Sequence, residues 1–424
     1  MSRLFISWVV LSIPVAWSQE VPSDAPSLTL LRAAELTLER NPQLRSAPFG
    51  REAASAVLEQ AALKPQWSVN LQVEDFAGSG ALSGFSASET TLRLSRIFQR
   101  SDVRSGRMSI ASSQAAQLES RLEVERLDLM TLLTRRFEAV VNRQEFLQLA
   151  QESVDVWQRA RDLAQIRERS GAAPAVERLR TEIRLADAGL QVEDAEHGLR
   201  VARLSLAATW GDLSPTFGQA NANLCSLPPL IPFEAIVANL DQNPDLQRFA
   251  SEQRLQEARA HLANSRRRPD WTLSAGVRRL EQLDDQALVF SISVPLGSAV
   301  RAAPVVRRAN ALRQQSVFAE QAARLELHAT LYELYQELVH TRSRVSLFDA
   351  EILPRANIIL DDIQAGYRVG QFSHLELVNA QTELLSARAA RLTACSDHQL
   401  RLIDIERLTG AGSVWLAVRP GVSP

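Results

Sequence analysis

The sequence of 424 residues has little cysteine and no large excess of either charge. Its 47 lysine and arginine side chains stand against 49 aspartate and glutamate side chains, so no basic field is present to hold a nucleic acid. Cys225 and Cys395 are the only cysteines, too few for the disulfide framework typical of an exported fold of this size. They fall in a predicted linker and a predicted helix, and the sequence leaves open whether they pair or remain two thiols.

The sequence also lacks the patterns that mark an enzyme or a metal site. Its histidines are scattered, without a His-x-x-x-His pair that could bind zinc, and no nucleophile stands with a base in a catalytic arrangement. The stretch "GSGALSG" (78–84) resembles a dinucleotide-binding fingerprint, but its last glycine is one place late and it joins two predicted strands, so we interpret it as a loop. We therefore expect no enzymatic activity, no cofactor and no metal site.

The N-terminus has the features of an export signal. Arg3 precedes the mostly apolar stretch "LFISWVVLSIPVAW" (4–17), and Ala16-Trp17-Ser18 forms an A-x-S cleavage pattern. The apolar stretch is too short for a comfortable membrane helix. We expect residues 1–18 to be a signal peptide and the mature chain to lie outside the cytoplasm.

The rest of the sequence consists of two copies of one pattern. Gly171 and Gly370 each interrupt a long helical pattern, and Glu177 and Glu376 follow six residues later, so both pairs stand 199 residues apart. This constant offset predicts a structural duplication. The predicted organisation is a first repeat at 19–210, a Pro-rich linker at 211–232, a second repeat at 233–410 and a C-terminal tail at 411–424.

Each repeat opens with a helix holding an Asn-Pro pair and continues into a predicted strand hairpin, at 67–98 and at 271–296. The strands are about ten residues long and alternate apolar with polar residues. This length and pattern are typical of tilted strands that cross a bilayer in a barrel. The first strand of each hairpin begins with a tryptophan, Trp67 or Trp271, and tryptophan is a residue type that suits a membrane interface. For one isolated hairpin, a soluble sandwich would be the alternative.

A helical hairpin follows each strand hairpin, at 103–209 and at 305–409. Residues 103–169 contain no proline, and apolar residues recur three or four positions apart, as in a coiled coil. Some 65 helical residues make a rod of roughly 100 Å, which needs helical neighbours. Gly171 and Gly370 are the predicted turns, and Pro354 is expected to kink the second rod.

Four amphipathic strands cannot close a pore by themselves, yet strand edges must be paired in lipid. Three copies would supply twelve strands, an even number within the range of bacterial barrels. The sequence therefore predicts an α+β membrane protein with two internal repeats, in which a homotrimer would share a 12-stranded transmembrane β-barrel, four strands per chain.

These residues resemble TolC-type outer membrane efflux proteins, and among them the CzcC-like branch associated with heavy-metal efflux. The most specific stretches are "VEDFAGSG" with "ETTLRLS" in the first copy and "AGVRRLEQLDDQALVFSISVPL" in the second. The resemblance covers essentially the mature chain. It implies a TolC-like trimer in the outer membrane of a Gram-negative bacterium, with outer membrane lipid around its strands. Its large periplasmic portion would be a long α-helical coiled-coil barrel.

The same resemblance implies partners and a cargo. A periplasmic adaptor and an inner-membrane RND transporter would complete a tripartite pump, for which the chain is the exit duct for divalent heavy-metal cations. The stretches "QRSDVRSGR" (99–107) and "GSAVRAAP" (297–304) depart from the glycine-rich turn common in the branch, and this departure bears on the cargo more than on the fold.

The resemblance also assigns roles to residues near the two turns. Adaptor docking is assigned to Ser170, Gly171 and Ala172 in the first copy and to Val369, Gly370, Gln371, Phe372 and Ser373 in the second. The constriction of the closed channel is assigned to Glu376 and Asn379, of which only Glu376 is acidic. From the residues alone, Glu376 could instead be a solvated carboxylate favoured by the start of its helix. His374, close by, is expected to be a solvated tip residue.

Two alternatives share part of the pattern. A periplasmic adaptor also combines a long helical hairpin with strands, but it carries one hairpin, whereas this chain carries two with an amphipathic strand pair before each. An outer membrane channel for drug efflux or type I protein secretion would have the same pattern, because the tunnel is a conduit and the transporter selects the cargo.

Overall fold

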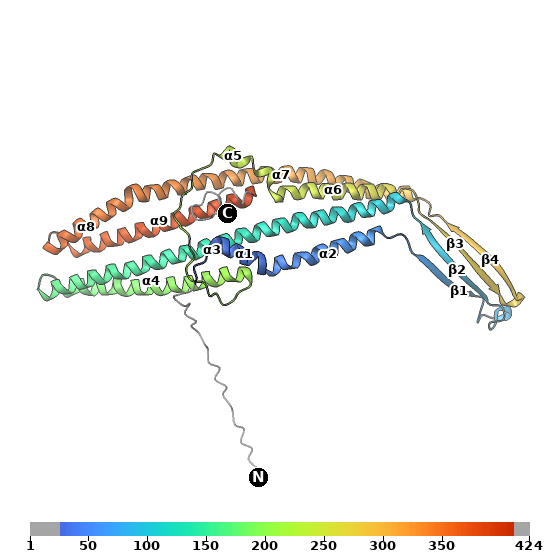
Figure 1. The fold of residues 1–424 in the computed structure, drawn as a ribbon, viewed down its shortest axis with the longest axis horizontal. Helices are drawn as coiled ribbons and strands as arrows, with labels where there is room; N and C mark the ends of the chain where they lie inside the picture. Colours follow the sequence, from blue (N-terminus) through green and yellow to red (C-terminus); the bar gives the residue numbers. More distant parts are fainter. Residues whose placement is uncertain (1–25, 411–424) are drawn as a thin grey trace, which may run out of the picture.

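The computed structural model describes residues 26–410, an elongated molecule with a sheet at one end and two helical tips at the other (Figure 1). The predicted signal peptide, residues 1–18, and the predicted tail, residues 411–424, lie outside the described residues. In chain order the main elements are α1 (Leu30–Arg40), α2 (Pro42–Ala62), β1 (Trp67–Glu74), β2 (Glu89–Phe98), α3 (Ser101–Arg169), α4 (Ala175–Ala207), α5 (Phe233–Val237), α6 (Pro244–Ser265), β3 (Trp271–Leu280), β4 (Asp285–Ser293), α7 (Ser298–Leu347), α8 (Leu353–Val369) and α9 (His374–Thr409).

The four strands form one antiparallel sheet in the order β1-β2-β3-β4. The two hairpins are joined through β2 and β3, where Phe98 lies opposite Trp271. Gly276 is required at this junction, because a Cβ atom there would lie 2.3 Å from the carbonyl oxygen of Leu92 on β2. β1 and β4 are left as the two open edges of the sheet.

One face of the sheet is apolar and uncovered in the single chain. Strand pairing sets Leu71 opposite Leu92, Leu92 opposite Val277, and Val277 opposite Leu288, which makes one apolar row across all four strands. Each of these side chains is at least 44% exposed. The other face carries the aligned row Ser68, Ser95, Ser274 and Ser291. An exposed apolar face of this extent is a surface for lipid or for another protein.

The long helices of the two copies differ. The first, α3, runs for 69 residues without a break, whereas a π-helical turn at Phe348–Ile352 separates α7 from α8. Pro354 is the second residue after this turn. Because proline has no N–H and its ring crowds the preceding turn, the wider turn accommodates it. None of the described helices is both long and apolar enough to cross a membrane.

The Asn-Pro pair that opens each repeat ties the start of the repeat to its end. The Asn41 side chain accepts from the backbone N–H of Gln43 and donates to the carbonyl oxygen of Thr209 at 2.7 Å. In the second copy Asn243 donates in the same way to the carbonyl oxygen of Leu408. Both asparagines are buried. Each asparagine therefore caps the start of one helix and also donates a hydrogen bond to a carbonyl oxygen at the end of another helix of its repeat.

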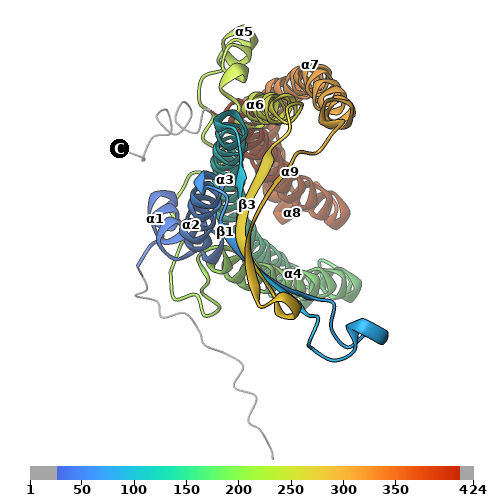
Figure 2. The same cartoon turned by 90° about the vertical axis from the view of Figure 1, so that its right-hand side faces the viewer.

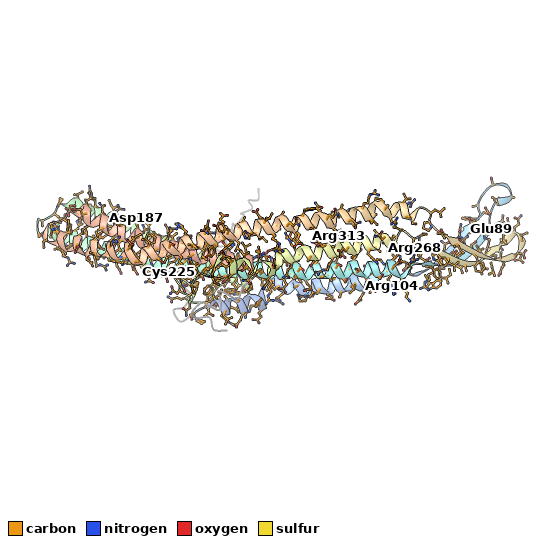
Figure 3. All side chains as sticks on the ribbon, turned by 90° about the horizontal axis from the view of Figure 1, so that it is seen from above. Glu89, Arg104, Asp187, Cys225, Arg268 and Arg313 are labelled. Carbon is orange, nitrogen blue, oxygen red and sulfur yellow. A yellow bond between two sulfur atoms is a disulfide. The ribbon has the colours of Figure 1, made fainter. Side chains whose placement is uncertain are left out.

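The linker between the repeats is fixed to α9. Cys225 and Cys395 form a disulfide with Cα atoms 4.9 Å apart, and Cys225 lies between the tips and the sheet along the molecule (Figure 3). The Gln399 side chain donates to the carbonyl oxygens of Leu224 and Ser226, on both sides of Cys225. Of the two alternatives that the sequence leaves open, the structure has the disulfide, because the linker crosses α9 where Cys395 faces it.

Between the sheet and the middle of the molecule, α2, α3, α6 and α7 lie side by side in that order as one curved layer (Figure 2). The short helices α1 and α5 lie on the outer side of the curve. Toward the tips, α3 pairs with α4 and α8 pairs with α9. The layer thus has an outer side on which α1 and α5 lie, a concave inner side and two free edges, α2 and α7.

Candidate functional site at the hairpin tips

The two turns at the tips have the same backbone geometry. Gly171 has φ 72° and Gly370 has φ 83°, in the left-handed region that favours glycine. The N–H of Ala172 donates to the carbonyl oxygen of Arg167 at 2.8 Å, and the N–H of Gln371 donates to that of Gly366 at the same distance. These bonds close the ends of α3 and α8 in matching ways, so the duplication extends to the turns.

The residues predicted for adaptor docking lie around these turns, at the end of the molecule far from the sheet (Figure 1). Val369 is 79% exposed. Phe372 is half-buried because its ring packs on Gly366, where a Cβ atom would lie 2.4 Å from it. The remaining predicted docking residues, Ser170, Gly171, Ala172, Gly370, Gln371 and Ser373, are exposed. Docking itself stays a prediction.

Glu376 caps its own helix. Its backbone N–H donates to the Ser373 hydroxyl oxygen at 3.2 Å, while its carboxylate accepts from the backbone N–H of Ser373 at 2.7 Å and from the hydroxyl at 2.8 Å. These hydrogen bonds, the backbone one foremost, lower the pKa of Glu376. The carboxylate therefore stays ionised while it holds the start of α9. Its assignment to the channel constriction stays a prediction.

The two neighbours of Glu376 in the sequence-based site lie in different surroundings. Asn379 is exposed on α9. His374 is only 6% exposed, and its ring lies 6.1 Å from the ring of Tyr367. The expectation of a solvated His374 is therefore wrong, because the side chain turns inward between the two hairpins. Burial lowers the pKa of His374, so the ring is neutral at pH 7.

A contact between the two hairpins was not predicted. The Tyr367 hydroxyl on α8 donates to the carboxylate of Glu177 on α4 at 2.8 Å, and the tyrosine is 1% exposed. The Arg167 guanidinium lies 4.4 Å from the centre of the Tyr367 ring and donates to the tyrosine carbonyl oxygen. Burial, followed by the Glu177 carboxylate, raises the pKa of Tyr367. This cluster of Arg167, Tyr367 and Glu177, the tip cluster, joins the two turns.

The two tryptophans predicted for the membrane interface both lie at the helical end of the sheet. The Trp67 ring lies 4.9 Å from the Arg96 guanidinium, and the Trp271 ring stacks on Phe98 at 5.4 Å. Both indoles are about half exposed. Their common level along the strands is consistent with a girdle at a membrane surface, which stays a prediction.

The described residues bring together no three histidine, cysteine, aspartate or glutamate side chains that could hold a metal ion. What the tips offer instead is exposed turns for a partner and buried polar contacts between hairpins.

An antiparallel sheet with an exposed apolar face, joined to two long helical hairpins, is the fold of TolC-like outer membrane channels. The solved structures of CusC are similar with a TM-score of 0.75 and 16% identity, covering 95% of this chain and 98% of that one. The outer membrane protein VceC from Vibrio cholerae is similar with a TM-score of 0.72 and 16% identity, over 90% and 96% of the two chains.

The sequence comparisons place the chain more closely. Residues 235–411 match the family model of the outer membrane efflux protein. The cobalt-zinc-cadmium resistance protein CzcC of Cupriavidus metallidurans is 25% identical over 393 residues, covering 91% of both chains. The resemblance to the TolC-type outer membrane efflux family, with similarity to CzcC, is confirmed.

Proposed function

We propose that three copies of this chain form the channel of a tripartite efflux pump in the outer membrane of a Gram-negative bacterium, with a large periplasmic portion. The observation that carries the proposal is the sheet. Its apolar face is uncovered, and its edge strands β1 and β4 are unpaired in the single chain. Pairing β1 of one copy with β4 of the next closes twelve strands and leaves no edge in the lipid.

The helical layer supports the same closure. Its two free edges carry exposed apolar side chains, among them Phe49 and Val57 on α2 and Val300 and Phe318 on α7. Packing α2 of one copy against α7 of the next would bury both sets while the strands pair above them. The closed assembly would have α1 and α5 on its outside and a lumen along the concave side.

The mass of the purified protein tests this assembly. In detergent, light scattering should give the mass of three chains, and circular dichroism should show the full strand content. A stable monomer that keeps its strands would contradict the proposal, because the uncovered sheet would then need no partner copies.

The tips would dock a periplasmic adaptor that links the channel to an inner-membrane RND transporter. A Gly370→Trp change should block cross-linking to the adaptor in cells while leaving outer membrane trimers intact. Gly189→Trp is the matched control, since Gly189 is exposed on α4 with open space around it and lies away from the turns. Equal cross-linking of both variants would exclude the turn as a docking site.

The similarity to CzcC supports divalent heavy-metal cations as the cargo. Deletion of the gene should lower the tolerance of cells to cobalt, zinc or cadmium, and the intact gene should restore it. If tolerance to drugs falls instead, or if secretion of a protein stops, the cargo belongs to the second candidate function, an outer membrane channel for drug efflux or type I secretion.

Glu376 and Asn379 would line the closed end of the tunnel, where threefold symmetry makes a ring of three carboxylates. Such a ring binds a cation to relieve its mutual repulsion. Glu376→Gln removes the charge and keeps the capping box, since glutamine also serves at this position. Cobalt added from the periplasmic side should then block single channels of the wild type more than those of the variant. Glu383→Gln, on the same helix, is the control, and equal block in all three would exclude the ring.

A further inference from the structure

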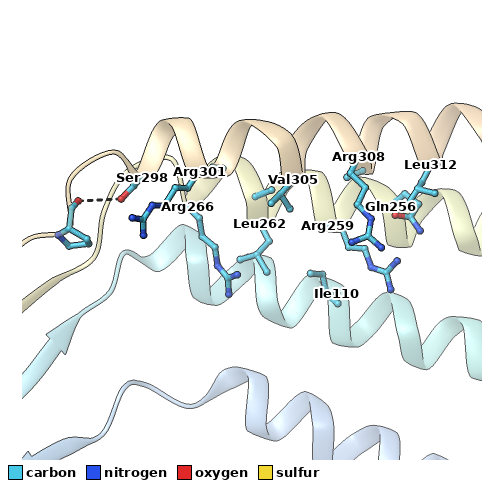
Figure 4. A pocket seen from close by; sticks show the side chains of 14 residues that line it. Ile110, Gln256, Arg259, Leu262, Arg266, Ser298, Arg301, Val305, Arg308 and Leu312 are labelled. Atoms are coloured by element: carbon cyan, nitrogen blue, oxygen red, sulfur yellow. Dashed lines mark hydrogen bonds between the residues drawn. The ribbon is translucent and has the colours of Figure 1, made fainter.

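A groove of about 720 Å³ lies at the sheet end of the helical layer (Figure 4). It is formed by α6 and α7, with Ile110 of α3 at its lower side, and it begins at the passage from β4 into α7, marked by Pro295 and Ser298. This volume is typical of sites that hold a ligand of drug size. Neither the tips nor the membrane sheet contributes to the groove.

Four arginines surround the groove: Arg259 from α6, Arg266 directly after α6, and Arg301 and Arg308 from α7. All four are exposed, and none forms an ion pair with a carboxylate of the described residues. Arg313 on the same helix, by contrast, pairs with Glu257 at 3.0 Å. Residues 298–319 contain four arginines and no acidic residue, although the whole chain has a net charge of −2. The groove is therefore a locally cationic site.

The floor of the groove is apolar and holds one unsatisfied polar atom. Leu262 is buried at the floor with Val305 near it, and Leu312 lies farther along the groove beside Gln256. Gln256 is 3% exposed, and its amide nitrogen donates to the carboxylate of Glu252. Its oxygen Oε1 has no hydrogen-bond partner among the described residues. A buried acceptor without a donor is costly unless a ligand or water satisfies it.

The groove opens on the concave side of the helical layer. Figure 4 views it with the strands on the left and α7 uppermost, from the side opposite to that of Figure 1. The short helices α1 and α5 lie on the other side of the layer. Under the proposed function, on which this placement rests, the concave side is the lumen, so the trimer would carry twelve arginines around one level of the channel.

We infer that this groove binds an organic anion with an apolar body. Guanidinium groups match carboxylate and sulfonate oxygens with paired hydrogen bonds. The apolar floor at Leu262 and Val305 takes the body of the ligand, and Gln256 Oε1 accepts from a donor group on it. A free divalent cation is repelled by the same four charges. The groove is thus an anion-binding site in the channel wall, distinct from the cation-binding ring proposed at Glu376 and from the cation cargo of the proposed function.

The test uses 1-naphthalenesulfonate as the probe and the purified protein in nanodiscs, titrated by calorimetry. The wild type should bind the probe, and the double variant Arg259→Gln/Arg308→Gln should bind it about tenfold more weakly or worse. Arg307→Gln is the matched control, because Arg307 is exposed on α7 but does not line the groove. The cation 1-naphthylmethylammonium, with the same ring system, should not bind.

Binding of the cation as tightly as the sulfonate, or equal affinity of the double variant and the wild type, overturns the inference. The assembly is measured separately, by light scattering on the same samples. A trimer that conducts but does not bind the sulfonate contradicts only the inference of an anion site. A monomer that binds the sulfonate supports the anion site and contradicts the proposed trimer. In planar bilayers the sulfonate should reduce the current of the wild type more than that of the double variant, and equal reduction contradicts the lumen placement.

Discussion

The substitution Tyr367→Phe removes the hydroxyl group through which Tyr367 joins the two hairpin tips. The hydroxyl donates to Glu177 at 2.8 Å, and both the ring packing and the Arg167 hydrogen bond to the backbone carbonyl of residue 367 survive in phenylalanine. The variant therefore removes a single bond between α8 and α4 and leaves a buried ring of nearly the same shape. The tips should separate more often as a result.

The size of the effect follows from the burial of the bond. Tyr367 is 1% exposed, so water replaces the lost bond poorly. A hydrogen bond to a charged group contributes roughly 1.5–3 kcal/mol, which corresponds to about a tenfold to hundredfold change in the equilibrium between joined and separated tips. Glu177 loses its tyrosine partner at the same time, which adds to the effect in the same direction.

Hydrogen–deuterium exchange measures this opening directly. Peptides covering residues 165–178 and 366–377 should exchange at least about tenfold faster in Tyr367→Phe, because local opening limits their exchange. The control is Tyr332→Phe, whose ring packs edge-on against Phe233 and whose hydroxyl has no described hydrogen bond. Combining Tyr367→Phe with Glu177→Ala should add little to either change alone. Unchanged exchange at the tips, or full additivity, would refute the coupling.

Three further outcomes are expected. Burial lowers the pKa of His398 to about 4, below its ordinary 6.5, so between these pH values only the unfolded chain takes up the proton. About 3 kcal/mol of folding stability should therefore be lost as the pH falls from 6.5 to 4. Thermal unfolding of His398→Gln should show a flatter pH dependence than that of the wild type. Replacing Cys225 and Cys395 by serine opens a link across 170 residues and should lower the unfolding temperature, with about 5 kcal/mol as the upper limit. Gly276→Val should reduce folded trimer on semi-native gels, since its Cβ would collide with Leu92.

Local patterns were sufficient for much of this fold. The strands begin at Trp67 and Trp271, as the alternation of apolar and polar residues predicts. The helical rods reverse at Gly171 and Gly370, where the backbone requires positive φ. In each case the signal lies within a few residues of the structure that it determines. Pro354 predicts a kink for the same reason, but the sequence did not predict that a π-helical turn would accommodate the proline.

Features that depend on distant segments were not predictable. Cys225 and Cys395 pair only because the linker crosses α9 at one place, and nothing in the spacing of 170 residues shows that crossing. The same holds for the Tyr367 bond to Glu177, which joins residues 190 positions apart. His374 was expected to be solvated as a residue of the tip, but the packing of one hairpin on the other decides its burial.

The two turns have different residues at the helix cap, and the glutamates three positions later, Glu177 and Glu376, make different contacts. In the second copy Ser373 caps α9, and its N–H and hydroxyl hold the Glu376 carboxylate at the start of that helix. In the first copy Pro174 occupies the cap of α4 and supplies neither an N–H nor a hydroxyl. The Glu177 carboxylate is therefore free to accept from Tyr367 on the other hairpin. The Glu376 carboxylate therefore caps its own helix, whereas the equivalent Glu177 carboxylate links the two hairpins through Tyr367.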